Sequence, residues 1–199
     1  MPDTTLRKQM SRKERAEDLL DHAARFIVEE GWESLNMEGL AARAGVSKSL
    51  PYKHFSNRDD VLLALWVRET TRIDLMINEA MSKEPTVEGR IRASINIWYD
   101  SMASSGSIHI LDRAGVGSTE LQGMRWERMA RYQQTWAQQA QEIGDLDDEQ
   151  ATIVAAIMLG GLLNVGEQWI ARGDPREVVV ETFVAACLLC FRGVHPIRD

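Results

Sequence analysis

One short segment of the chain, residues 36–55, concentrates the side chains that could bind another molecule. It reads NMEGLAARAGVSKSLPYKHF, a pattern of short helix, glycine turn and second helix. Its second half offers hydroxyl, ammonium, phenol and imidazole groups, which can donate hydrogen bonds to phosphates and base edges. A protein uses this arrangement to put a short helix into the major groove of DNA. The candidate DNA contacts, including one arginine after the segment, are Asn36, Ser47, Lys48, Ser49, Leu50, Tyr52, Lys53, His54 and Arg58.

A long amphipathic helix is predicted before this segment. Apolar side chains recur at helical spacing through residues 12–30, and Gly31 is a natural terminator. Asn36 is then a good N-cap for a short helix that runs to about Arg43.

The second helix of the segment is predicted to begin with Ser47 as its N-cap and to run to about Phe55. Gly45 supplies the turn conformation before it. Pro51 removes only the first intrahelical hydrogen bond, but it biases Leu50 away from helical geometry. We therefore expect a helix with a distorted first turn.

Glycine, small and aromatic residues around this segment stand in a recognisable register. They are Ala23, Ala24, Phe26, Gly31, Trp32, Leu40, Ala41, the run 44–48, the run 52–55 and the run 57–62. In this register, about residues 16–65 resemble the N-terminal domain of TetR-family transcriptional regulators. The DNA contacts that the resemblance implies are Ser47, Lys48, Tyr52 and His54, with Arg58 near a phosphate. It also implies that the rest of the chain binds a ligand and dimerises.

The whole chain is predicted to be all-α. It has few prolines and no strand pattern, and helical stretches are expected at about residues 58–81, 87–103, 117–143, 148–172 and 176–193. Three parts are expected: a flexible basic arm (1–11), a three-helix helix-turn-helix domain (12–58), and a helical bundle for effector binding and dimerisation (59–199).

The net charge of −7 is unusual for a DNA-binding protein, but its distribution is uneven. Residues 1–60 carry ten Lys and Arg against eleven Asp and Glu, whereas the remainder carries thirteen against nineteen. DNA binding depends on the local patch more than on the total charge. The start lacks the apolar stretch of a secretory signal, the apolar runs are interrupted, and two cysteines form no disulfide framework. We therefore expect a cytoplasmic protein without a membrane partner.

An aromatic cluster in the second part is a candidate effector pocket. Two neighbouring helices carry more large aromatic side chains than compact packing needs, although a plain core is the simpler interpretation. The candidate pocket residues are Trp98, Tyr99, Met102, Trp126, Met129, Tyr132 and Trp136. Asp112 or Glu127 could anchor a polar group, and the Ser/Gly-rich runs at 104–106 and 115–118 could form an entrance or a hinge.

The last two helices are apolar around much of their circumference, which a helix buried on one side does not need. Small residues in them permit close approach of a second subunit, so a twofold homodimer through a four-helix bundle is predicted. The candidate interface residues are Ala155, Leu159, Leu163, Val179, Phe183 and Ala186.

No residues converge as a catalytic or metal-binding set. Cys187 and Cys190 form a CxxC pair inside an apolar helical stretch with only His195 nearby, so buried thiols are expected. We therefore expect no enzyme activity, cofactor or metal.

The favoured hypothesis is a ligand-responsive repressor, which binds a palindromic DNA operator as a dimer and is released by a small, largely apolar or aromatic effector. An activator of the same fold remains open. So do a helical module that binds a protein partner without DNA and, less favoured, a helical enzyme that uses the aromatic cavity.

Overall fold

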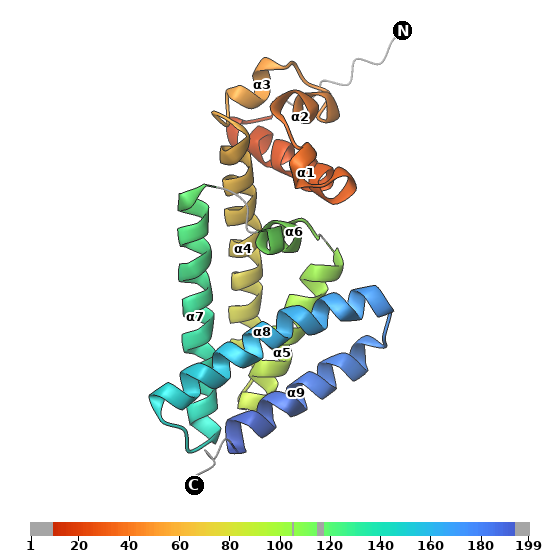
Figure 1. The fold of residues 1–199 in the computed structure, drawn as a ribbon. Helices are drawn as coiled ribbons and strands as arrows, with labels where there is room; N and C mark the ends of the chain where they lie inside the picture. The colour runs from red at the N-terminus through yellow and green to blue at the C-terminus, as the bar shows by residue number, and fades with distance from the viewer. Residues whose placement is uncertain (1–9, 105, 115–117, 194–199) are drawn as a thin grey trace. The chain divides into compact units, whose positions relative to one another are not determined.

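The structure, a computed structural model, describes residues 10–104, 106–114 and 118–193, and every regular element in them is a helix (Figure 1). In chain order the elements are α1 (Arg12–Glu30), η1 (Trp32–Ser34), α2 (Met37–Arg43), α3 (Ser49–Tyr52), α4 (Arg58–Ser82), α5 (Val87–Ser104), α6 (Ser107–Ala114), α7 (Thr119–Ile143), α8 (Asp148–Arg172) and α9 (Arg176–Gly193). The all-α prediction is therefore confirmed over the described residues. The predicted arm, residues 1–11, lies outside them except for Met10 and Ser11.

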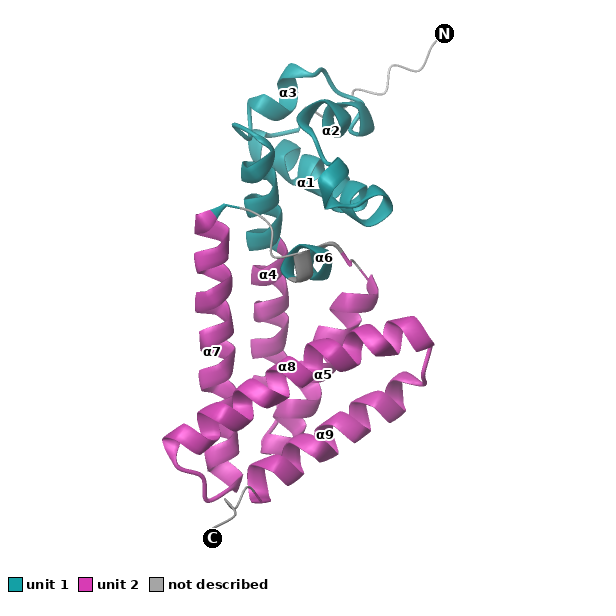
Figure 2. Ribbon diagram, viewed as in Figure 1, with its two compact units in different colours: residues 1–68, 107–118 teal, residues 69–106, 119–199 magenta. Residues whose placement is uncertain are grey.

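The chain divides into two compact units, coloured separately in Figure 2. The N-terminal unit comprises residues 1–68 together with 107–118, and the C-terminal unit comprises 69–106 and 119–199. The predicted boundary between the two parts lay after residue 58, near the start of α4, whereas in the structure α4 belongs to the N-terminal unit as far as Arg68. Helix α6, which comes from the middle of the chain, also belongs to that unit.

The N-terminal unit is built on α1, whose ends are both fixed locally. Ser11 and Glu14 form a capping box at its start, and the Gly31 N–H bonds to the Ile27 carbonyl at its end. Gly31 has a φ of +85°, a conformation that L side chains rarely adopt, so its role as terminator is confirmed.

Helix α6 packs on α1 within the same unit through its buried apolar residues Ile108 and Leu111. A short hydrogen bond of 2.6 Å from the Trp66 indole nitrogen to the Asp112 carboxylate ties α6 to α4. Asp112 therefore serves inside the N-terminal unit, and not as the anchor of an effector pocket that the sequence suggested.

The second helix of the helix-turn-helix begins later than predicted. Helix α3 starts at Ser49, and Ser47 makes no capping bond to it, so the N-cap prediction was wrong. The reason is Pro51, which has no N–H to offer the Ser47 carbonyl; the Leu50 N–H bonds to that oxygen instead, at 2.9 Å. The turn before it is as expected, since Gly45 has a φ of +64°.

The C-terminal unit packs α5, α7, α8 and α9 around an apolar core, with α8 and α9 lying side by side in Figure 1. A capping box between Asp147 and Gln150 starts α8, and Gly173 ends it in the left-handed conformation. Inside the unit, Gly166 leaves room for two neighbours, because a Cβ there would lie 2.6 Å from the Met102 sulfur and 2.9 Å from the Tyr99 ring.

Helix α8 qualifies as a membrane span by length and composition alone, with a mean hydropathy of 1.5 over its best window. The sequence was expected to contain no stretch that could span a membrane, because glycines interrupt this apolar run. Glycine is not a charged or strongly polar residue, so the run still passes the test of length and hydropathy. Only 28% of that window is buried in the chain, so α8 has an apolar face that nothing in the described residues covers.

Candidate DNA interface and ligand cavity

The outer surface of the helix-turn-helix presents most of the residues that the sequence singled out. Lys48 has a side chain that is 74% exposed, and Tyr52 is 54% exposed. Ser47, Ser49 and Lys53 are exposed as well. The exposed phenol of Tyr52 is accessible to another molecule.

Beneath this surface, apolar residues hold the two short helices together. Leu40 and Ala41 of α2 are almost fully buried, and Pro51 and Phe55 close the other side. Val46 is half-buried at the turn. The expected packing of α3 through Leu40, Val46 and Phe55 is therefore consistent with the burial of these residues.

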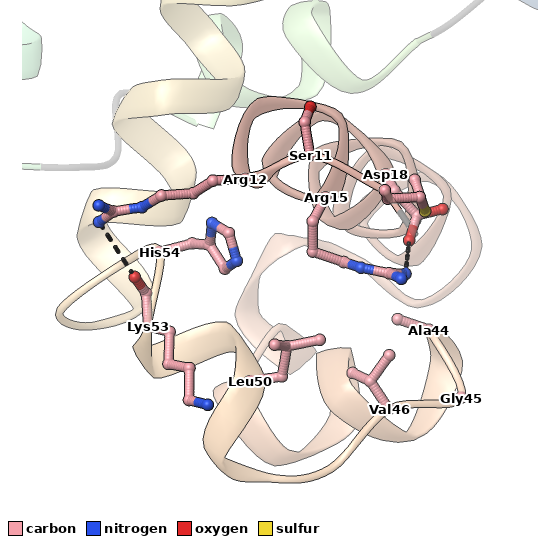
Figure 3. A pocket seen from close by; sticks show the side chains of 11 residues that line it. Ser11, Arg12, Arg15, Asp18, Ala44, Gly45, Val46, Leu50, Lys53 and His54 are labelled. Atoms are coloured by element: carbon pink, nitrogen blue, oxygen red, sulfur yellow. Dashed lines mark hydrogen bonds and ion pairs between the residues drawn. The ribbon is translucent and has the colours of Figure 1, made fainter. Parts of the chain in front are cut away.

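A groove of about 1100 Å³ runs beside α3, between the turn and the start of α1 (Figure 3). Arg12, Arg15 and Lys53 line it together with Asp18, whose carboxylate pairs with Arg15 at 3.1 Å, and the Arg12 guanidinium donates to the Lys53 carbonyl at 3.4 Å. His54 lies between the two arginine side chains in the figure. Partial burial, and then the positive charges of Arg12, Arg15 and Lys53, lower the pKa of His54, so it is neutral near pH 7.

Two of the predicted DNA-contact residues, Asn36 and Arg58, form hydrogen bonds within the protein. The Asn36 side chain accepts a bond from the Gly39 N–H at 2.8 Å and donates to the Ser34 carbonyl at 2.9 Å, so it caps α2. Arg58 donates to the Trp32 carbonyl at 2.6 Å and lies over the Trp32 ring. Both side chains are therefore already engaged inside the N-terminal unit.

An apolar cavity of about 40 Å³ lies in the C-terminal unit among α4, α5, α7 and α8. Four of the predicted pocket residues line it, together with five that were not predicted to lie there, two of which (Leu159 and Leu163) were predicted interface residues. The lining residues are Trp98, Met129, Tyr132 and Trp136, with Ile77, Ser94, Leu159, Leu162 and Leu163. A drug-sized ligand needs roughly 300 Å³ or more, so the cavity must widen to hold one.

The other three predicted pocket residues lie elsewhere. Tyr99 and Met102 are buried against Gly166 in the core, and Trp126 is 77% exposed. Glu127, suggested as an anchor, is exposed too. The suggested entrance or hinge runs include Ser105 and residues 115–117, which lie outside the described residues.

A part-buried polar bridge that was not predicted from the sequence stands at the edge of this cavity. The Arg128 guanidinium binds the Asp74 carboxylate at 2.7 Å and 3.0 Å, and the Tyr132 hydroxyl donates to the same carboxylate at 2.6 Å. Arg128 is only 6% exposed. The sequence feature that could have indicated this bridge is the spacing of Arg128 and Tyr132, which places a charged group and a phenol on one side of α7.

The predicted interface residues divide between the subunit's own core and its surface. Ala155, Leu159 and Phe183 are buried within the chain, while Leu163, Val179 and Ala186 are half-buried. The apolar side chains that α8 and α9 leave exposed are Ile153, Ile157, Ile170, Val178 and Leu189. A groove of about 580 Å³ adjoins them, lined by Val165, Val178, Val179, Phe183 and Ala186 among others.

Both cysteines of the CxxC pair lie in α9, where Cys187 is fully buried, as predicted, and Cys190 is only half-buried. Burial raises the pKa of the Cys187 thiol to about 12, so it is an inert core group. No cluster of three metal-ligating side chains occurs among the residues that the structure describes.

Comparison with known families gives one match at the N-terminal end. Residues 19–65 match the family of bacterial regulatory proteins, tetR family. This stretch contains all of α2 and α3, and therefore the whole helix-turn-helix.

Among curated proteins, the chain is similar to the HTH-type transcriptional activator FasR of Mycolicibacterium smegmatis. The two are 30% identical over 92 residues, which are 46% of this chain and 42% of that protein. The chain is also 20% identical over 104 residues to a fatty acid metabolism regulator protein of Bacillus subtilis, of which the match covers 54%. The chain thus spans about half the length of the curated relatives it matches.

Solved structures share the fold over almost the whole chain. The fatty acid degradation regulator FadR of Bacillus halodurans has a TM-score of 0.71 at 20% identity and covers 94% of this chain and 99% of its own. FadR of Bacillus subtilis, solved with stearoyl-CoA, has a TM-score of 0.69 at 18% identity, and the match covers 90% of this chain and 99% of that one. AibR, solved with isovaleryl coenzyme A and operator DNA, has a TM-score of 0.69 at 21% identity, and the match covers 87% of this chain and 97% of that one. At these identities the likeness establishes the fold.

Proposed function

We propose that this chain, whose N-terminal domain belongs to the TetR family of bacterial regulatory proteins, is a dimeric transcriptional regulator that an acyl thioester releases from its operator. The observation that carries the DNA-binding part is the exposed surface of α3. Tyr52 projects from this helix and Lys48 and Lys53 flank its two ends, and buried apolar residues hold the helix in place. Such a surface offers ammonium groups to phosphates and a phenol to base edges.

One arginine of the adjoining groove supports the same conclusion. Arg12 lies beside His54 and adds its charge to that of Lys53, while Arg15 is paired with Asp18 at 3.1 Å (Figure 3). Each lysine or arginine that neutralises a phosphate releases counterions, so operator binding should weaken steeply as salt rises.

The effector class rests on the cavity and on the relatives. The wall is apolar except for Ser94 and the hydroxyl of Tyr132, which suits a hydrocarbon chain. The similar proteins reported above include regulators that are described by fatty acid metabolism or degradation, or were solved with an acyl-coenzyme A. An acyl-coenzyme A is therefore the effector class that fits this chain best, with its acyl chain in the widened cavity.

The exposed apolar faces of α8 and α9 support dimerisation. Ile153 and Ile157 lie one turn apart on α8, and Val178 and Leu189 are 60% and 73% exposed on α9. A second copy of the chain would bury these side chains by twofold symmetry. It would also cover the face that makes α8 resemble a membrane span, which is consistent with a cytoplasmic protein.

Binding assays with the promoter region of the chain's own gene, and with fragments selected from random DNA, test this proposal. Wild-type protein should bind a palindromic fragment at nanomolar concentration, and Tyr52→Ala and Lys48→Ala should each weaken that binding about tenfold. A panel of acyl-coenzyme A compounds from four to eighteen carbons (roughly the range of common fatty acids) should include at least one that releases the DNA. Failure to bind any DNA would favour the protein-interaction module, while binding that acyl-coenzyme A strengthens would favour an activator-like response.

FasR, to which the chain is similar, is described as an activator. An activator is therefore the second candidate for this chain. A reporter gene under the selected operator distinguishes the two, since deletion of the regulator raises expression for a repressor and lowers it for an activator.

A further inference from the structure

The Asp74–Arg128–Tyr132 bridge joins α4 to α7 inside the C-terminal unit. Asp74 belongs to the part of α4 that lies in that unit, and the other two residues stand one turn apart on α7. The Asp74 carboxylate accepts hydrogen bonds from the guanidinium at 2.7 Å and from the phenol at 2.6 Å. The carboxylate is thus the point at which α7 holds α4.

Tyr132 belongs both to this bridge and to the cavity. Its ring lines the apolar space, and its hydroxyl donates a hydrogen bond to Asp74; the side chain as a whole is half-buried. Arg128 lies over the same ring, 5.0 Å from its centre, and 5.7 Å from the ring of Trp98, a second cavity wall. Two walls of the cavity therefore rest on the bridge.

A ligand cannot enter this cavity without moving a wall. The space of about 40 Å³ is several times too small for an organic ligand of ordinary size. Rotation of Tyr132 would widen it, but that motion takes the hydroxyl away from Asp74 and leaves Arg128 to hold the carboxylate alone. Loss of a hydrogen bond to a carboxylate that also pairs with the buried Arg128 guanidinium is costly, so the two arrangements are discrete rather than continuous.

We propose that this bridge is the coupling element of the regulator: it holds α4 against α7 in the DNA-binding state, and a ligand in the cavity opens it by displacing Tyr132. This inference rests on the proposed function. It adds the residues through which cavity occupancy reaches α4, the helix that continues into the N-terminal unit.

The test compares two Tyr→Phe variants in the full-length protein. Tyr132→Phe keeps the cavity wall and removes only the hydroxyl. Tyr99→Phe is the matched control, because Tyr99 is fully buried in the same unit, donates a weak bond of 3.4 Å to the Leu162 carbonyl, and does not line the cavity. Thermal unfolding should show that both variants are folded.

Operator affinity without any ligand is the first readout. Tyr132→Phe should bind the operator about tenfold more weakly than wild type, as expected from the loss of one hydrogen bond to a charged group, while Tyr99→Phe should bind like wild type. Wild-type affinity in Tyr132→Phe, or an equal loss in the control, would overturn the inference.

The second readout uses palmitoyl-coenzyme A as the probe. Because coupling is reciprocal, Tyr132→Phe should bind the probe more tightly and show a smaller ratio between operator affinities without and with it. If the probe releases wild-type protein and Tyr132→Phe with the same ratio, the bridge is not the coupling element. If wild type binds the operator and no acyl-coenzyme A releases it, the effector class is wrong, and the first readout still decides the role of the bridge.

Discussion

The Lys48 ammonium lies 3.0 Å from the Glu38 carboxylate, and the two side chains are 74% and 67% exposed. One of the main DNA-contact candidates thus carries an acidic neighbour from α2 on the same surface. An ion pair this exposed contributes little to stability, so its main effect is to compete with phosphates for Lys48.

Glu38→Gln should therefore strengthen operator binding. Removal of the competing carboxylate frees Lys48, and we expect a gain of about threefold at low salt that shrinks as salt rises. Fluorescence anisotropy with labelled operator measures it. Glu149→Gln, which changes the net charge equally at an exposed site at the start of α8, should leave the affinity unchanged. Equal effects from the two substitutions would show that only total charge matters.

The close approach of α2 to α1 gives a second prediction. A Cβ at Gly39 would lie 2.8 Å from the Phe26 ring, whereas a Cβ at Gly123 on α7 would meet nothing within 4 Å. Gly39→Ala should destabilise the protein by about 1–3 kcal/mol through overpacking, and Gly123→Ala should stabilise it by about 1 kcal/mol through helix propensity. Urea denaturation followed by circular dichroism checks both. If Gly39→Ala left the free energy of unfolding unchanged, the Phe26 ring would be able to move aside without loss of stability.

His54 should make the free protein sensitive to mild acid. Burial and three nearby cations lower the pKa of His54 below its ordinary value of 6.5, so the unfolded chain binds the proton more readily than the folded one. The stabilisation is complete above pH 6.5 and is lost as the pH falls through the lower folded-state pKa. Urea denaturation from pH 7.5 to 5 should show a steeper loss in wild type than in His54→Gln. Parallel curves would contradict the assignment.

The exposed face of α8 predicts how assembly can be disrupted. Ile157 is 58% exposed on that face, and Leu75, on α4, is 64% exposed. Ile157→Asp should convert the dimer to a monomer at micromolar concentration, because a buried unpaired carboxylate in the interface is costly. Leu75→Asp is the control and should leave the mass unchanged. Light scattering measures both, and a dimeric Ile157→Asp would place the interface elsewhere.

The bounds of the long helices could be predicted well from the sequence, whereas α3 begins later than predicted and ends at Tyr52 rather than at about Phe55. Helices α8 and α9 have the predicted bounds, because helix starts and ends depend on the residues next to them: Asp147 caps the start of α8, Gly173 ends it, and Pro175 precedes α9. The start of α3 was harder to predict. Ser47 is a favourable cap by type, but the missing N–H of Pro51, four residues later, decides where the regular helix begins.

The cavity and the apolar faces could be predicted only in part. Trp126 is about 120° from Tyr132 around an ideal helix. The aromatic residues of α7 therefore point in different directions and cannot all line one cavity. On α8 the difficulty is of another kind. Ala155 and Ile157 are about 160° apart around the helix, and both sides are apolar, so the sequence does not say which side the subunit buries.

Since α6 reaches the N-terminal unit from the middle of the chain, that unit is not a single continuous fragment. A fragment that ends at Arg68 would lose Ile108 and Leu111 from the packing against α1, and Asp112 as a partner of Trp66. For protein engineers this restricts the exchange of modules. Exchange of the whole N-terminal unit requires three junctions, after residues 68, 106 and 118, so that α6 is transferred together with the helices it packs on.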